Sequence, residues 1–276
     1  MKKLIIVLLS VLCVLSLTAC GSKDNSEKSK TITVAATAVP HAEILEKAAD
    51  ILKAEGWELK TIVYNDYIQP IEVVESGDAD ANYFAHEPYL NNYNSEFKTS
   101  QVVVAKIHSE PMGIYTGKVK ELSQLAAGDE ILVPNDGTNE TRALMLLEAN
   151  GILVLPEGTT NESLITKKDL KDENYLVKGV TLKEIEAATI PHIIDDAAIA
   201  VLNGNYAMEA GITERGIAFE AADSDRMVTY VNVLACKDGS QDSEAIQALA
   251  KTLKSEEMKQ FILEKYNGTV IFYEGE

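Results

Sequence analysis

From residue 31 onward, the order of apolar and polar positions predicts an alternation of strands and helices. The apolar run 31–36 predicts a buried strand, and residues 41–54 repeat apolar side chains at helical spacing up to Gly56. The other predicted strands are 58–64, 79–84, 102–107, 130–134, 183–187, 197–202 and one from 230, and the other predicted helices are 69–75, 88–97, 138–150, 190–196, 242–254 and 256–266. Repeated βα units of this kind are typical of mainly parallel sheets flanked by helices.

The predicted elements divide into two α/β lobes. Lobe 1 is expected to hold residues 31–112 together with 230–276, and lobe 2 residues 113–229. A cleft between two such lobes can enclose a small ligand when a hinge closes.

The N-terminus has the pattern of an export signal. Lys2 and Lys3 precede the apolar run 4–17, which is too short to span a bilayer as a mature helix. The run ends in Leu17-Thr18-Ala19-Cys20-Gly21, which resembles a bacterial lipobox. We therefore expect removal of residues 1–19, a lipid such as palmitate on Cys20, and a flexible tether over 20–30. The protein would then be anchored on the extracytoplasmic face of the cell membrane. The alternative is an ordinary signal peptide cut nearby.

The net charge and the cysteine content limit the possible binding partners and disulfides. The formal net charge is -18, which argues against nucleic acid and against adsorption to anionic lipid. Of the three cysteines, Cys13 lies in the leader and Cys20 is the lipidation site, so Cys236 is left without a disulfide partner. Its apolar neighbours predict that Cys236 fills the core.

Six segments, spread over nearly the whole mature chain, carry a family resemblance. They are Asn65–Pro70, Asn82–Leu90, Glu110–Tyr115, Val133–Arg142, Asp195–Gly211 and Tyr230–Asn232. In this order they resemble the methionine-binding lipoproteins, the NlpA-type substrate-binding subunits of methionine ABC importers. The resemblance implies a periplasmic-binding-protein fold of the second type, a ligand such as L-methionine between the lobes, and delivery to an ABC permease driven by a cytoplasmic ATPase. It implies neither an enzyme nor a cofactor, and we expect a monomer.

An amino-acid ligand needs a cation for its carboxylate. Arg142 is the best candidate, because a guanidinium grips a carboxylate through two parallel hydrogen bonds. Asn139 lies three residues earlier on the first turn of the same predicted helix and faces the same way. That turn also presents free backbone N–H groups to an anion.

Neutral acceptors and aromatic rings complete the predicted site. Asn203 and Asn232 correspond to family asparagines that reach the amino-acid backbone, and each follows an apolar strand. The alternative is that each caps a turn. The side-chain pocket is expected to hold Tyr67, Phe84 and His86, since aromatic faces suit a polarisable thioether. We expect Tyr89 to anchor a helix, and Asn205 is not included.

Three departures from the family pattern leave the ligand open. Ala85 stands in place of a glutamine, Gly137 in place of a proline and His192 in place of an arginine. A methionine derivative, a methionine-containing dipeptide or another small amino acid remains an alternative.

Other classes of protein find less support. The chain has no G-x-S-x-G, H-E-x-x-H or P-loop motif that would indicate an enzyme. A metal receptor would share the two-lobed shape, but no two of the four histidines have close ligand spacing, so no metal site is predicted.

Overall fold

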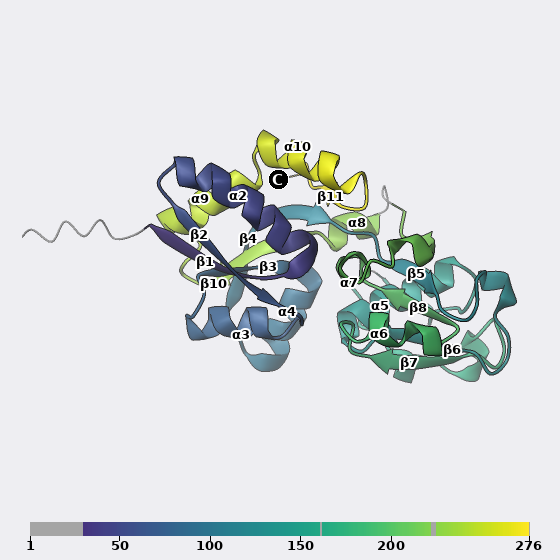
Figure 1. Cartoon of the computed structure of the whole chain (residues 1–276). Helices are drawn as coiled ribbons and strands as arrows, with labels where there is room; N and C mark the ends of the chain where they lie inside the picture. Colours follow the sequence, from purple (N-terminus) through teal and green to yellow (C-terminus); the bar gives the residue numbers. More distant parts are fainter. Residues whose placement is uncertain (1–29, 161, 222–224, 276) are drawn as a thin grey trace, which may run out of the picture. The chain divides into compact units, whose positions relative to one another are not determined.

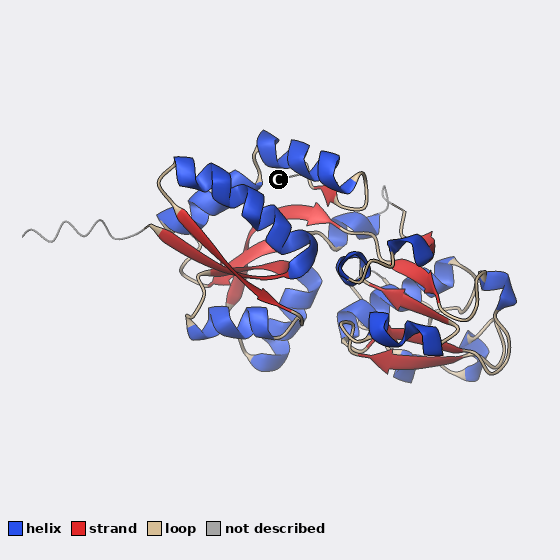
Figure 2. Ribbon diagram, in the orientation of Figure 1, coloured by secondary structure: helices blue, strands red, loops and turns tan. Residues whose placement is uncertain are grey.

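A computed structural model describes residues 30–160, 162–221 and 225–275 (Figures 1 and 2). Residues 31–276 form one compact unit, and the predicted leader, Cys20 and the tether up to residue 29 lie outside the described residues. None of the described helices combines the length and the apolar character needed to cross a bilayer.

The first sheet has the strand order β11-β4-β10-β3-β1-β2. Its strands are β1 (Thr31–Thr37), β2 (Glu58–Tyr64), β3 (Ala81–His86), β4 (Gln101–Ser109), β10 (Asn232–Lys237) and β11 (Ile271–Phe272). All six residues of β3 are buried, because this central strand is covered on both faces.

Helices cover both faces of the first sheet (Figure 1). The helical turn η1 (Ala38–Ala42) leads into α2 (Glu43–Ala54), which packs with α9 (Glu244–Leu253) and α10 (Glu256–Tyr266) on one face. On the other face lie α3 (Gln69–Ser76) and α4 (Glu87–Phe97). Tyr83 packs in the first of these cores and Phe84 in the second, so the two rings point to opposite faces as the period of a strand requires.

The second sheet has the order β7-β6-β8-β5-β9. Its strands are β5 (Gly113–Thr116), β6 (Glu130–Pro134), β7 (Thr181–Ile185), β8 (Ile199–Leu202) and β9 (Gly216–Phe219). One core joins it to α5 (Gly137–Ala149), and another joins it to α6 (Ile190–Ile193) and α7 (Gly204–Glu209). The remaining short elements are η2 (Leu122–Gln124), η3 (Lys167–Asp169), η4 (Asp172–Asn174), η5 (Ile194–Asp196), η6 (Thr213–Arg215) and α8 (Asp225–Thr229).

Both sheets are mixed, although most strands in each share one direction. In the first sheet β1, β2 and β3 are parallel, whereas β10 runs against its neighbours β3 and β4. In the second sheet β6, β7 and β8 are parallel, whereas β5 runs against β8 and β9. The reversed strands β5 and β10 directly follow the two passages of the chain between the sheets. A strand that enters a sheet at the carboxyl ends of its neighbours must run opposite to them. The predicted α/β class is confirmed, and each mainly parallel sheet also contains reversed strands.

Many predicted elements agree with the structure. Residues 58–64, 130–134 and 256–266 coincide with β2, β6 and α10. The pattern did not predict β5, β9, β11, α7 or α8. Asn232 was expected to follow a strand, but it begins β10.

Candidate functional site

A cavity lies where the carboxyl ends of the parallel strands of both sheets meet. Its volume is about 320 Å³, including the part open to solvent. Such a position is where open α/β sheets usually bind ligands. The lining residues are Tyr67, Phe84, Ala85, His86, Tyr89, Glu110, Asn139, Arg142, Asn203, Gly204, Asn205 and Asn232.

All seven residues predicted to bind the ligand line this cavity. They are Tyr67, Phe84, His86, Asn139, Arg142, Asn203 and Asn232. Their contact with a ligand stays a prediction. Of the residues that sequence reasoning left out, Tyr89, Glu110 and Asn205 carry polar groups into the same lining.

One part of the lining is aromatic. The ring centroid of Tyr67 lies 5.7 Å from that of Phe84 and 5.6 Å from that of Tyr89, and Tyr206 stacks on Tyr67 at 4.9 Å. The Tyr89 hydroxyl donates to the backbone carbonyl of Tyr67 at 3.1 Å. The Tyr89 hydroxyl therefore holds the backbone at Tyr67, and Tyr89 also lines the cavity.

Another part of the lining is a chain of amides joined to His86. Nδ1 of His86 accepts the N–H of Tyr89 at the start of α4, so its proton lies on Nε2, which donates to Oδ1 of Asn139 at 3.1 Å. Burial, and then the charge of Arg142, lower the pKa of His86 to about 3, so the ring is neutral. Nδ2 of Asn203 donates to the same Oδ1 at 2.7 Å. Asn203 starts α7 without a side-chain capping bond, which argues against the turn-capping alternative.

Two amide atoms in the lining have no hydrogen-bond partner among the residues that the structure describes. Tyr67 donates its hydroxyl to Oδ1 of Asn205 at 2.6 Å, which leaves Nδ2 of Asn205 buried and unpaired. Oδ1 of Asn203 is also buried and unpaired. Because a buried polar group without a hydrogen bond costs free energy, one donor and one acceptor here are available to a ligand.

Arg142 differs from its predicted role. Its Nε and Nη2 edge already binds the carboxylate of Glu220, with distances of 2.9 and 2.6 Å, and Nη2 also donates to the backbone carbonyl of Glu110. Burial alone would lower the pKa of Arg142, but the charge and hydrogen bonds of Glu220 hold it above its usual value. The two-bond grip expected for a ligand carboxylate is therefore taken by Glu220. Among the described residues, no hydrogen bond involves the remaining Nη1 of Arg142.

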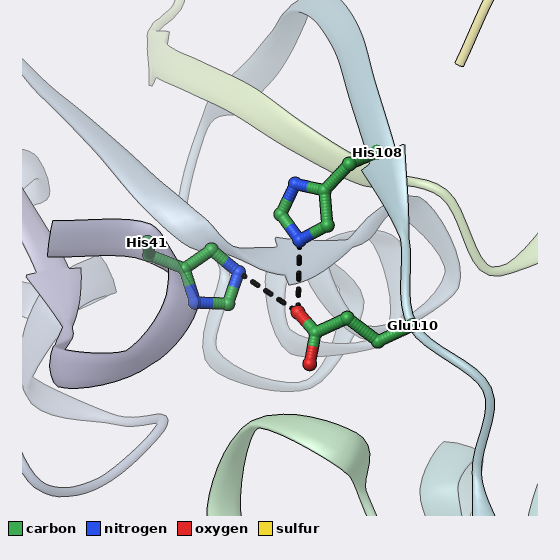
Figure 3. Close-up of side chains that lie close together, drawn as sticks. All are labelled: His41, His108 and Glu110. Atoms are coloured by element: carbon green, nitrogen blue, oxygen red, sulfur yellow. Dashed lines mark hydrogen bonds and ion pairs between the residues drawn. The ribbon is translucent and has the colours of Figure 1, made fainter. Parts of the chain in front are cut away.

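Asn232 lies beside a buried group that could hold a metal ion. It pairs with His86 on β3 and with His108 on β4, and its Oδ1 lies 3.2 Å from Nε2 of His41. His41, His108 and Glu110 bring their ligand atoms within 4.8 Å of one another (Figure 3). Histidines far apart in sequence thus come together, which ligand spacing did not predict.

The hydrogen bonds of this group are complete without an ion. Nδ1 of His41 faces the Thr37 hydroxyl at 2.8 Å, and Nδ1 of His108 faces the Tyr83 hydroxyl. Nε2 of His108 donates to Oε1 of Glu110 at 2.9 Å, and Nε2 of His41 lies 3.5 Å from the same oxygen. A metal at Nε2 would have to displace these bonds and switch both tautomers.

The sequence profile of the NlpA lipoprotein family matches residues 32–273. The chain belongs to the NlpA lipoprotein family. This confirms the family predicted from the six segments, and with it the two-lobed α/β fold.

Relatives of this NlpA lipoprotein cover almost the whole chain. The chain is 34% identical over 273 residues to the methionine-binding lipoprotein MetQ of Bacillus subtilis, and this match covers 98% of each of the two chains. A lipoprotein from Ruminococcus gnavus is similar in structure, with a TM-score of 0.84 and 49% identity over 89% of this chain and all of that one. A nutrient-binding protein from Burkholderia cenocepacia, solved bound to methionine, has a TM-score of 0.81 and 33% identity over 87% of this chain and 99% of that one.

Proposed function

We propose that this NlpA lipoprotein is an extracytoplasmic solute-binding protein that captures methionine, most directly L-methionine. The observation that carries the proposal is one small cavity that combines an aromatic part with an unpaired buried donor and acceptor. Similarity supports it, because the Bacillus subtilis relative is named as methionine-binding and the Burkholderia cenocepacia protein holds methionine.

The lining fits the chemistry of the amino acid. Tyr67, Phe84 and Tyr89 offer ring faces and edges to a thioether, whose polarisable sulfur packs well against aromatic rings. The amides of Asn203 and Asn205 provide an acceptor for an ammonium and a donor for a carboxylate.

The same residues support capture by closure. In the proposed division, residues 31–112 and 230–276 form one lobe and 113–229 the other. The bonds from His86 to Asn139 and from Tyr67 to Asn205 then join the two lobes across the ligand cavity. Ligand contacts added to these bonds would favour the closed arrangement over an open one.

We further propose that the protein is held to the membrane by lipid on Cys20 and delivers its ligand to an ABC permease with a cytoplasmic ATPase. Palmitate labelling of cells tests the anchor. The wild type should take up label, and Cys20→Ala should remain unlabelled and leave the membrane fraction. Equal labelling of both would overturn the anchor.

Thermal unfolding of the full-length lipoprotein in detergent tests the ligand. At a hundredfold excess over Kd, a ligand that binds only the folded state adds about 2.7 kcal/mol, which raises Tm by roughly 5–10 °C. Methionine should give this shift, and methionine dipeptides, other amino acids and Zn²⁺ should give smaller ones. A shift with Zn²⁺ or a dipeptide, and none with millimolar methionine, would overturn the proposal.

A further inference from the structure

Glu110 is a buried carboxylate that pairs with none of the described lysine and arginine side chains. It follows β4, where the chain passes from the first sheet to the second, and it is 5% exposed. Arg142 contacts only its backbone carbonyl and pairs with Glu220. Among the side chains described within residues 30–160, 162–221 and 227–275, no lysine or arginine forms an ion pair with Glu110; His41 and His108 place Nε2 within 4 Å of its Oε1, and the backbone N–H of Asn205 also bonds the carboxyl group.

The two imidazoles orient this carboxylate but do not neutralise it. Burial lowers the pKa of His41 to about 4 and that of His108 to about 3, so both rings are neutral at physiological pH. A carboxylate oxygen only accepts hydrogen bonds, so the proton of each ring lies on Nε2. Nε2 of His108 donates to Oε1 of Glu110 at 2.9 Å, and Nε2 of His41 donates to Oδ1 of Asn232 at 3.2 Å and lies 3.5 Å from the same Oε1 (Figure 3). The carboxyl group of Glu110 is thus held in one orientation; burial raises its pKa, and the nearby charge of Arg142 and the N–H of Asn205 offset that effect only in part.

The second oxygen of Glu110 is directed toward the ligand cavity. Oε2 points away from both imidazole rings in Figure 3. Glu110 and Gly204 both line the cavity, and a Cβ on Gly204 would lie 3.4 Å from Oε2. Because such a Cβ would also lie only 3.2 Å from Cβ of Glu110, glycine lets the start of α7 pack closely against Glu110. Oδ1 of Asn203, the buried acceptor without a partner, belongs to the same lining.

A cationic group of a ligand in the cavity would donate hydrogen bonds to both acceptors, Oε2 of Glu110 and Oδ1 of Asn203. An uncompensated buried charge is strongly unfavourable, and a hydrogen-bonded cation beside it offsets that cost. With Arg142 paired to Glu220, the charged side chains at the cavity carry a net negative charge. A metal ion is the other cation with this chemistry, but the Nε2 protons of His108 and His41 already bond Glu110 and Asn232.

We propose that Glu110, oriented by His41 and His108, binds the α-ammonium group of the ligand, with Oδ1 of Asn203 as a second acceptor. The assignment rests on the proposed function and extends it to specificity. A free amine becomes a requirement for tight binding, so deaminated and N-acylated analogues of methionine are rejected. Glu110 then selects the ligand class, and the aromatic residues select the thioether.

Glu110→Gln tests this assignment, since it keeps the shape of the side chain and removes the charge. Calorimetric titration of the full-length lipoprotein compares L-methionine with 4-(methylthio)butanoic acid, which lacks only the amine. The wild type should prefer methionine at least about thirtyfold, as expected for a buried charged pair. E110Q should lose most of that preference while its affinity for the deaminated acid stays the same or rises. E110D, which keeps the charge, should retain much of the preference.

Glu87→Gln is the matched control, because it makes the same change on an exposed carboxylate outside the cavity lining. It should keep the wild-type preference. Equal weakening of both ligands in E110Q would show a structural role and overturn the assignment. If E110Q does not fold, the wild type alone tests the assignment. A preference for methionine over the deaminated acid of less than threefold would then overturn the assignment.

Two further outcomes separate the possible failures. If the wild type binds methionine and E110Q keeps the full preference, the assignment fails and the proposed function stands. If the wild type binds no methionine, both fail. Binding of one Zn²⁺ per chain that E110Q abolishes, with the methionine preference unchanged, would assign the group to a metal ion instead.

Discussion

Replacement of Arg142 by alanine should destabilise the fold, beyond any effect on ligand binding. The Glu220 side chain is fully buried, and Arg142 is 3% exposed. Removing Arg142 leaves Glu220 with the N–H of Met112, 2.9 Å away, as its remaining hydrogen-bond donor within the described part of the chain. Breaking a buried ion pair from one side typically costs about 3–5 kcal/mol, because the other charge stays buried and unpaired. We expect a loss of that size, a large part of the ~5–15 kcal/mol that stabilises a typical domain.

Urea unfolding followed by far-ultraviolet circular dichroism measures this loss. Arg215→Ala is the matched control, since Arg215 also binds a carboxylate and a backbone carbonyl, but its partner Asp195 is 83% exposed. Exposed pairs contribute about 0–1 kcal/mol, so R215A should stay close to the wild type. In the double variant R142M/E220Q the buried charge is gone, and its stability should exceed that of R142A. If R142A unfolds within 1 kcal/mol of the wild type, the reasoning about Glu220 is refuted.

Three further predictions concern Glu140, Cys236 and Tyr67. Burial raises the pKa of Glu140 to about 7 from an ordinary 4.5, so the native state binds a proton in this window that the unfolded state does not. The wild type should therefore gain about 3 kcal/mol relative to E140Q as the pH falls from 7 to 4.5, and parallel urea midpoints would contradict this. Burial raises the pKa of the Cys236 thiol to about 11, so Ellman's reagent at pH 8 should react with it only after unfolding. Tyr67→Phe removes the hydroxyl that orients Asn205, and methionine affinity should drop about two- to tenfold by calorimetry; no change would exclude that role.

Local pattern was enough to predict many of the elements and seven of the residues that line the cavity. Asn139 and Arg142 lie on the first two turns of α5, and His86 ends β3. Because strand ends and helix starts meet at the same edge of a sheet, the sequence placed all three residues there. The seven predicted residues meet there because parallel strands bring their carboxyl ends together.

Partners from distant segments could not be predicted in the same way. Glu220 lies 78 residues from Arg142, directly after β9, a strand that the pattern did not reveal, so the guanidinium looked free for a ligand. His41 and His108 meet at Glu110 only because β1 and β4 end at the same edge of the first sheet. Asn205 gains its orientation from Tyr67, 138 residues away.

Calorimetric titration of L-methionine into the ligand-free, full-length lipoprotein tests the central claim most directly. The account predicts saturable binding of one methionine per chain, accompanied by a negative heat-capacity change as the ligand is buried between the lobes. The absence of saturable heat up to millimolar methionine, with the protein shown to be folded by circular dichroism, would contradict it.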